Sequence, residues 1–192
     1  MAFRDDKDFI NSVFLFIFME RLNKEFFRRD PDVAAKELLG KIIVRKTNNK
    51  EMRARIVETE AYFDSKDPAS RACRNGDICN TMMMDAGTIL IFNVHNNWLL
   101  NFVTGEEGKA EAALIRAVEP LNFNGKCNGP GLLTRALFIE KRFHKQNIIN
   151  NKEIFLVDDG FNDFNVDYDF RIGVRKDLKK KLRFYISENK HV

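Results

Sequence analysis

Hydrophobic and polar residues alternate along residues 54–62, and this pattern predicts a half-buried β-strand. Because side chains on a strand alternate between its two faces, one face combines two carboxylates with an aromatic ring. Carboxylates are costly to bury unless they are paired or used, and an acid beside a flat ring suits an enzyme that holds a planar ligand and deprotonates water. A surface strand with two solvated glutamates is the alternative. The expected faces are Ile56, Glu58, Glu60 and Tyr62 on one side and Val57, Thr59 and Ala61 on the other.

Other segments of the chain have strand or helix patterns of their own. A cap and a first-turn proline at Asp30-Pro31 predict a helix that Gly40 ends. A Gly-Pro-Gly turn at residues 129–131 opens a short amphipathic helix, and Asn96-Asn97 is expected to be a tight hairpin turn. The remaining expectations are strands at Ala54–Tyr62, Lys41–Lys46, Thr88–Val94, Trp98–Val103, Ala112–Val118 and Ile154–Val157, with polar loops at Asn147–Asn151 and Asp158–Asp169.

Strands dominate this pattern and local hairpins join several of them, which predicts an α+β fold with a curved, mostly antiparallel sheet. A chain of 192 residues with 44% hydrophobic residues can bury a core of its own and forms one domain. The net charge of +4 is too small to identify a partner. The three cysteines have no paired spacing and are interpreted as reduced thiols rather than as disulfides or a zinc site.

Arg116 stands in the middle of the apolar strand predicted at Ala112–Val118. A guanidinium does not lose its charge, so in an interior strand it must meet a carboxylate or a ligand. Glu58 and Glu60 are the natural partners. The free N–H groups at the start of the helix after Gly129 and Gly131 could bind an anion, although Gly-Pro-Gly is also an ordinary turn.

Two further stretches stand out in the sequence. The C-terminal part is rich in cations, which suits either a solvated face or a phosphate backbone. The apolar run at residues 13–19 is too short to span a bilayer and lacks the features of a signal peptide. It is expected to dock on the core or to start an N-terminal helix. No membrane partner is therefore expected, and the location expected is cytoplasmic and nucleoid-associated.

Taken together, the chain resembles the alkyladenine (3-methyladenine, methylpurine) DNA glycosylase family over about residues 24–187. Residues 1–23 are then an N-terminal extension and residues 24–192 the glycosylase-like domain. The motifs that carry the resemblance follow in the family's order: Glu25-Phe26-Phe27, Val33-Ala34, Leu38-Leu39-Gly40-Lys41, Val57–Tyr62, Asp67-Pro68-Ala69-Ser70, Gly87-Thr88, Leu114–Pro120, Gly129-Pro130-Gly131-Leu132, Arg171-Ile172-Gly173-Val174 and Leu182–Ile186.

The resemblance implies a monofunctional glycosylase that flips a damaged purine from duplex DNA and hydrolyses its N-glycosidic bond. The partner implied is double-stranded DNA containing damaged purines, the protein is expected to be a monomer, and no metal or organic cofactor is implied. A protruding β-hairpin would enter the minor groove. The resemblance assigns a catalytic role to two residues: Glu60 activates water, and Arg116 holds that water and the acid. It assigns the base pocket to Tyr62, Arg71, Phe92 and Asn101. His95 and Trp98 would flank the intercalating hairpin tip, and Gly129 and Gly131 would bind phosphate.

Three positions depart from the family pattern. Arg71 replaces a histidine, Phe92 and Leu90 stand where a pocket tyrosine is usual, and His95 replaces a tyrosine wedge. A fixed cation at Arg71 would repel cationic alkylated bases, unless Arg71 instead pairs with Asp64 or Asp67. Two other functions stay open: a nucleic-acid-binding protein of this fold with impaired chemistry, and a metal-dependent nuclease that uses Glu58, Glu60, Asp64 and Asp67.

Overall fold

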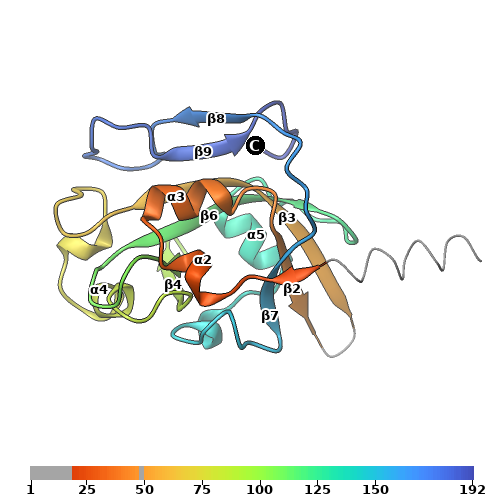
Figure 1. Ribbon diagram of the computed structural model, residues 1–192, viewed down its shortest axis with the longest axis horizontal. Coiled ribbons are helices and arrows are strands. Elements are labelled where there is room, and N and C mark those ends of the chain that lie inside the picture. The colour runs from red at the N-terminus through yellow and green to blue at the C-terminus, as the bar shows by residue number, and fades with distance from the viewer. Residues whose placement is uncertain (1–18, 48–49) are drawn as a thin grey trace, which may run out of the picture.

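A long strand, β3 (Glu51–Tyr62), runs through the middle of the sheet in the computed structural model, which describes residues 19–47 and 50–192 (Figure 1). Its start pairs with β2 (Ile42–Lys46), and its other edge pairs with β6 (Ala112–Pro120). In the described residues the strand order is β1 (Glu20–Arg21), β7 (Ile154–Asp158), β2, β3, β6, β5 (Asn97–Val103) and β4 (Ile89–Val94), and every pairing is antiparallel. The α+β prediction is therefore confirmed.

The other predicted strands lie close to their expected positions, and three strands, β1, β8 (Val166–Asp169) and β9 (Arg183–Ile186), were not predicted. β4 (Ile89–Val94) and β5 (Asn97–Val103) form the hairpin, and β7 (Ile154–Asp158) pairs with β2. The prediction of a polar loop through residue 169 is wrong at its end, because β8 (Val166–Asp169) pairs with β9 (Arg183–Ile186). β9 in turn pairs with the last half of β3, a long-range contact that short local patterns do not encode.

Short helices complete the fold. α3 (Pro31–Glu37) begins at the predicted proline and packs against β3, β6 and β9, and the chain turns at Gly40, whose φ is +83°. α5 (Pro130–Ala136) packs against β5 and β6. Figure 1 shows both helices against the sheet. The remaining elements are α2 (Lys24–Phe27), α4 (Asp77–Met82) and the 3₁₀ turns η1 (Arg71–Cys73) and η2 (Lys141–Phe143).

The core fills the space between the sheet and the helices. Its buried members include Phe27, Ile43, Phe102, Leu133 and Phe184. Ile56 joins this cluster together with its neighbour Val57, so the strict alternation predicted for β3 is interrupted. The shared face predicted for Ile56 and Glu58 is therefore wrong. A bulge is the reason, since Val57 has no partner on β6 between the pairs Ile56–Val118 and Glu58–Ala117.

The N-terminal end of the described chain joins the sheet before the predicted domain boundary. β1 (Glu20–Arg21) pairs with β7, and Met19 packs against the small apolar cluster of Ile42 and Val44. Apart from Met19, the apolar run at residues 13–19 lies outside the described residues.

The hairpin turn is displaced by one residue from its prediction. Val94 pairs with Asn97, which leaves His95 and Asn96 as the two turn residues, with φ of 48° and 62°. Positive φ at both positions is the geometry that matches the twist of a tight hairpin. Asn tolerates positive φ well, which favoured Asn96-Asn97 from the sequence. The Asn97 side chain instead donates to the carbonyl of His95 over 2.8 Å.

Candidate active site

Glu60 is fully buried, with none of its surface exposed, in the second half of β3. Three donors hold its carboxylate. The backbone N–H of Ile172 (2.8 Å) and Nη1 of Arg116 (3.2 Å) approach Oε1, and the Tyr62 hydroxyl donates to Oε2 over 2.7 Å. Buried charge therefore has the partners that it needs, and the alternative of a solvated surface strand is wrong for this face.

Arg116 lies on β6 where that strand has one residue more than its neighbour. It has no partner in the register between Glu58–Ala117 and Thr59–Ile115. Its guanidinium reaches both glutamates, with Nε 3.2 Å from Glu58 Oε1 and Nη1 3.2 Å from Glu60 Oε1. The expectation that Arg116 meets these two acids is confirmed, and the bulge is what turns its side chain to them.

Glu58 is held from a second side by Arg183 of β9, whose Nη1 donates to Oε1 over 2.9 Å. Arg183 also donates to Asp169 at 2.8 Å, so the β8–β9 hairpin is tied to the strand that carries the site. Glu58 is thus committed to two arginines. Glu60, which shares its oxygens with a hydroxyl and a backbone N–H, is the acid better placed for chemistry.

Tyr62 connects the acid to a second arginine. Its hydroxyl contacts Glu60, and the guanidinium carbon of Arg171 lies 4.6 Å from its ring centroid. Burial and the neighbouring Glu60 carboxylate raise the pKa of Tyr62 well above its usual value, so the phenol stays a hydrogen-bond donor. The ring lies beside the acid, as the shared face of Glu60 and Tyr62 predicted.

Burial raises the pKa of Glu60 above that of an ordinary glutamate. Arg116 opposes this effect most, followed by the Ile172 N–H and the Tyr62 hydroxyl, while Glu58 adds to it. A carboxyl whose pKa lies closer to neutrality is a stronger base once ionised, and the three donors keep the ionised form accessible.

The strands place Glu60 and one of the predicted pocket residues, Asn101, in one cross-strand row. Glu60 pairs with Leu114, Leu114 with Asn101, and Asn101 with Leu90, and directly paired residues share a sheet face. Asn101 is buried, and its amide nitrogen lies 3.2 Å from the Leu90 carbonyl oxygen. The carbonyl of its own amide is the group that it can turn to a ligand.

Arg71 lies over Phe92, with its guanidinium carbon 5.4 Å from the ring centroid. The alternative, an ion pair with Asp64 or Asp67, is not formed among the described residues. Asp67 is instead bound by Arg171 through both carboxylate oxygens, at 2.6 and 2.7 Å. Arg71 and Phe92 are therefore in cation–π contact, and their role as walls of a base pocket stays a prediction.

The hairpin presents one exposed residue and one packed residue at its tip. His95 is exposed in the turn. Trp98 is partly buried and packs against the main core, and its carbonyl accepts from Thr134 of α5 over 2.8 Å. At the N-terminus of α5, a Cβ on Gly131 would lie 2.6 Å from the Asn97 side chain, so this glycine has a packing reason of its own. The phosphate-binding role of Gly129 and Gly131 stays a prediction.

His144, which the sequence did not single out for any role, supports the base of this hairpin. Its Nδ1 accepts the backbone N–H of Ile91 over 3.1 Å, so the proton lies on Nε2, which is 3.0 Å from Asp77. Burial lowers the pKa of His144. A neutral imidazole thus joins β4 to the start of α4.

The four acids of the nuclease hypothesis do not form a metal site. Glu58 and Asp67 are each held by arginines, and no group of three or more potential ligands gathers anywhere in residues 19–47 and 50–192. Cys79 and Cys127 are free thiols.

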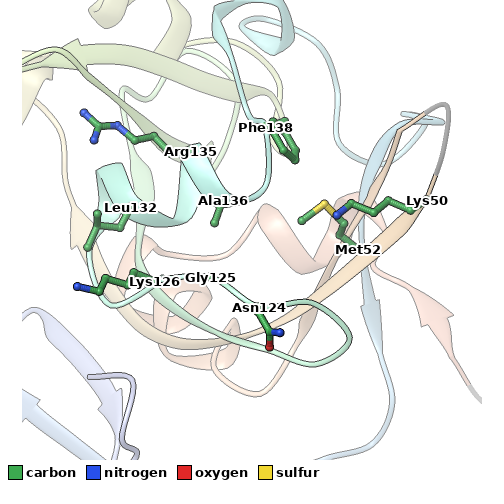
Figure 2. Close-up of a pocket in the computed structure, with 9 residues that line it drawn as sticks. All are labelled: Lys50, Met52, Asn124, Gly125, Lys126, Leu132, Arg135, Ala136 and Phe138. Carbon is green, nitrogen blue, oxygen red and sulfur yellow. The ribbon is translucent and has the colours of Figure 1, made fainter.

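A groove of about 390 Å³ lies apart from these residues, beside α5 (Figure 2). Lys50, Lys126 and Arg135 line it, together with apolar groups that include Met52 and Phe138. Met52 and Glu60 are eight residues apart on β3, which corresponds to roughly 25 Å along an extended strand. None of the predicted site residues lines this groove.

Comparison with known proteins identifies the family to which this arrangement belongs. The sequence profile described as Methylpurine-DNA glycosylase (MPG) matches residues 25–190. The chain belongs to this family. Among its relatives, a protein of Aeropyrum pernix is 39% identical over 89% of this chain and 92% of the relative. A protein of Borrelia garinii subsp. bavariensis is 37% identical over 89% of this chain and 98% of the relative. A protein of Clostridium perfringens is 34% identical over 90% of this chain and 98% of the relative. All three carry the name "Putative 3-methyladenine DNA glycosylase".

As a member of the methylpurine-DNA glycosylase family, the chain is a DNA N-glycosylase that acts on damaged bases, in base excision repair, and DNA is its substrate. Within the described residues, no helix has the length and apolar character needed to cross a membrane.

Sequence reasoning missed three contributors to this candidate site. Arg171, Ile172 and Arg183 occur in two of the family motifs without an assigned role, and the two arginines were otherwise counted only as part of a basic stretch. Their contacts with Glu58, Glu60 and Tyr62 depend on the pairing of β9 with β3. The only sequence signal for these contacts was the mixed composition of the C-terminal stretch, where arginines stand between apolar residues.

Proposed function

We propose that this glycosylase flips a damaged purine nucleotide out of the duplex and hydrolyses its N-glycosidic bond with a water molecule activated by Glu60. Cleavage of that bond develops positive charge on the sugar, so a nearby carboxylate stabilises the transition state as well as accepting a proton. In this scheme Glu60 both accepts the proton and stabilises the charge, so neither step requires a metal.

The observation that carries the proposal is the hydrogen bonding of Glu60. An ionised carboxylate offers about four acceptor positions. Ile172 and Arg116 approach Oε1 and Tyr62 occupies one position on Oε2, which leaves one position on Oε2 for the attacking water. Burial excludes bulk water, so the water that reacts enters together with the flipped nucleotide.

The surrounding residues fit the remaining steps. A flipped base requires aromatic faces, and Tyr62 and Phe92 provide rings on the acid's side of the pocket, with stacking worth roughly 1–3 kcal/mol per base. Asn101 lies in the same cross-strand row as Glu60 and can contact the purine edge. The exposed His95 at the hairpin tip can fill the space that the nucleotide leaves.

Glu60→Gln tests the proposal. The amide keeps the shape of the site but cannot accept the proton, so binding of lesion-containing duplex should persist while single-turnover release of the free base falls by several orders of magnitude. The measurement is release of free base from a panel of lesion duplexes, with a chelator present throughout.

Glu58→Gln is the matched control, because it removes the neighbouring carboxylate that two arginines already neutralise. It should retain far more activity than Glu60→Gln. Near-normal release by Glu60→Gln would transfer the role to Glu58. Tight lesion binding without release by the wild-type protein would instead favour a binding protein with impaired chemistry.

A further inference from the structure

The connection between β8 and β9, residues 170–182, passes over the proposed catalytic acid and is fixed there by Arg171. The Arg171 side chain is fully buried, and all five of its N–H groups have acceptors. Nη1 donates to the Ala61 carbonyl (2.8 Å) and to Asp67 (2.6 Å), Nη2 to Asp67 (2.7 Å) and to Asp177, and Nε to Asp177 (3.1 Å). Such complete use of a rigid fork fixes both position and orientation.

Two groups of the proposed site depend on where this guanidinium lies. The next residue along the chain is Ile172, whose backbone N–H donates to Glu60 over 2.8 Å. The guanidinium carbon of Arg171 also lies 4.6 Å from the centroid of the Tyr62 ring. None of the hydrogen bonds of Arg171 goes to Glu60. Arg171 therefore acts on Glu60 only through Ile172 and Tyr62.

Stability alone is a weak reason for this arrangement. Removing an arginine and a carboxylate from water has a large desolvation cost, and apolar residues of similar volume often stabilise a fold as well or better. Asp67 is buried with Arg171, and its pKa, which burial raises, is brought below the usual value by the Arg171 hydrogen bonds. What apolar packing could not reproduce is the fixed path of the backbone at residues 171–172.

We propose that Arg171 is a positioning residue that holds the Ile172 N–H on Glu60 and the Tyr62 ring beside it. The inference rests on the proposed role of Glu60 and adds a purpose for the β8–β9 connection. The side chains of Phe170 and Ile172 are 53% and 51% exposed, so this connection is held by its arginine and its backbone rather than by burial of its own apolar groups.

The consequence concerns the protonation of Glu60. A hydrogen bond from a backbone N–H favours the ionised carboxylate, so losing it raises the pKa of Glu60 further and moves the acid limb of base release to higher pH. The charged and titratable groups that face Glu60 are Glu58 and Tyr62 on β3, Arg116 on β6, Arg183 on β9, and Arg171 on the connection.

Ile172→Pro is the decisive variant, because proline lacks the N–H while Arg171 and Glu60 stay in place. Ile172→Ala is its matched control, since it removes the same exposed side chain and keeps the N–H. Both are compared with the wild-type chain in single-turnover release from a duplex containing hypoxanthine, a neutral lesion, from pH 4.5 to 8.5. In parallel, the Glu60 carboxyl is titrated in the DNA-free protein by ¹³C NMR, with its signal assigned from Glu60→Gln.

We expect Ile172→Pro to move the midpoint of the Glu60 titration, and the acid limb of base release, up by about one pH unit. At a pH below that limb, base release should then be about tenfold slower than in the wild type. Ile172→Ala keeps the N–H, so the Glu60 carboxyl in this variant should titrate at the wild-type pH. Arg171→Lys keeps the charge but loses the fork, and it should shift both readouts in the same direction as Ile172→Pro. This variant carries the test if the proline variant does not fold.

Identical titrations for Ile172→Pro, Arg171→Lys and the wild type would overturn the inference. Failure of the proposed function has a different signature, because the wild-type protein would then release no base at any pH. The NMR titration would still report whether Arg171 positions the N–H on Glu60.

Discussion

Arg71 is the residue at which this chain departs most in charge from the family pattern, and its place over Phe92 puts a fixed cation at the wall of the proposed pocket. Two unit charges at ~4 Å repel by about 4 kcal/mol at an effective dielectric of 20. A cationic base such as 7-methylguanine would meet that repulsion, whereas a neutral base would not.

We therefore expect neutral lesions such as hypoxanthine or ethenoadenine to be released faster than 7-methylguanine, and Arg71→His to shift the ratio toward methylated purines. The measurement is the ratio of single-turnover release rates for hypoxanthine and 7-methylguanine. Arg71→Lys, which keeps the charge, is the control and should retain the wild-type preference. A ratio that is the same for wild type and Arg71→His would contradict the role assigned to Arg71.

The residue types that chemistry requires could be recognised from the sequence at this scale. Two acids on a strand and one arginine on an apolar strand predicted a contact that Arg116, Glu58 and Glu60 make. Arg171 could not be assigned in the same way, because its partners Asp67 and Tyr62 lie about 100 residues away along the chain. Only the folded sheet brings them together.

Among the elements, the β4–β5 hairpin separates the two candidates for the DNA wedge. His95 is exposed in the turn, whereas Trp98 packs against the core and its carbonyl is bound by α5. A side chain committed to the core cannot enter a base stack without giving up its own buried surface. The geometry thus favours His95 over Trp98.

We expect His95→Ala to slow base release from duplex DNA roughly tenfold or more, since each 1.4 kcal/mol lost from the flipped state is tenfold. Release from the same lesion in single-stranded DNA should change little, because no stack has to be opened. Trp98→Phe, which keeps most of the core packing, is the control. Equal losses on both substrates would show that His95 is not a wedge.

The elements themselves were largely predictable because they follow local patterns. The strand that contains Glu60, the hairpin and the Pro31 helix all have a clear period or cap. β8 and β9 were missed because neither has a long alternating pattern, and their stability comes from pairing with each other and with β3. The shift of the turn to His95-Asn96 was likewise set by strand register, which residue preferences alone did not fix.

For the molecule as a whole, positive charge is concentrated on the β8–β9 connection, residues 170–182, which is the segment that covers Glu60. Its exposed cations lie between the two buried or half-buried anchors Arg171 and Arg183. A basic surface beside the acid is where a duplex with a flipped nucleotide would place its phosphates. The cations concerned are Arg175, Lys176, Lys179, Lys180 and Lys181.

We expect Lys179→Gln/Lys180→Gln to weaken DNA binding equally for damaged and undamaged duplexes. The slope of log K against log salt should fall by about 0.9 for each phosphate that the variant no longer neutralises. The matched control is Lys50→Gln/Lys126→Gln, which removes the same charge from the groove beside α5 and should leave the slope unchanged. Equal slopes for the two double variants would place the DNA backbone elsewhere.

The paired irregularities in β3 and β6 have a consequence for how such an enzyme can change over evolutionary time. Val57 is an extra residue on one strand and Arg116 on the other, and the register on both sides of them is the same. Deleting either residue alone would slide one strand against its neighbour and misplace everything beyond it. Deleting both would close an uninterrupted ladder and keep the two glutamates on their face. A lineage could thus lose Arg116, the arginine proposed to act beside Glu60, by two small deletions and still inherit an intact sheet, which is a direct route from a repair enzyme to a protein that only binds DNA.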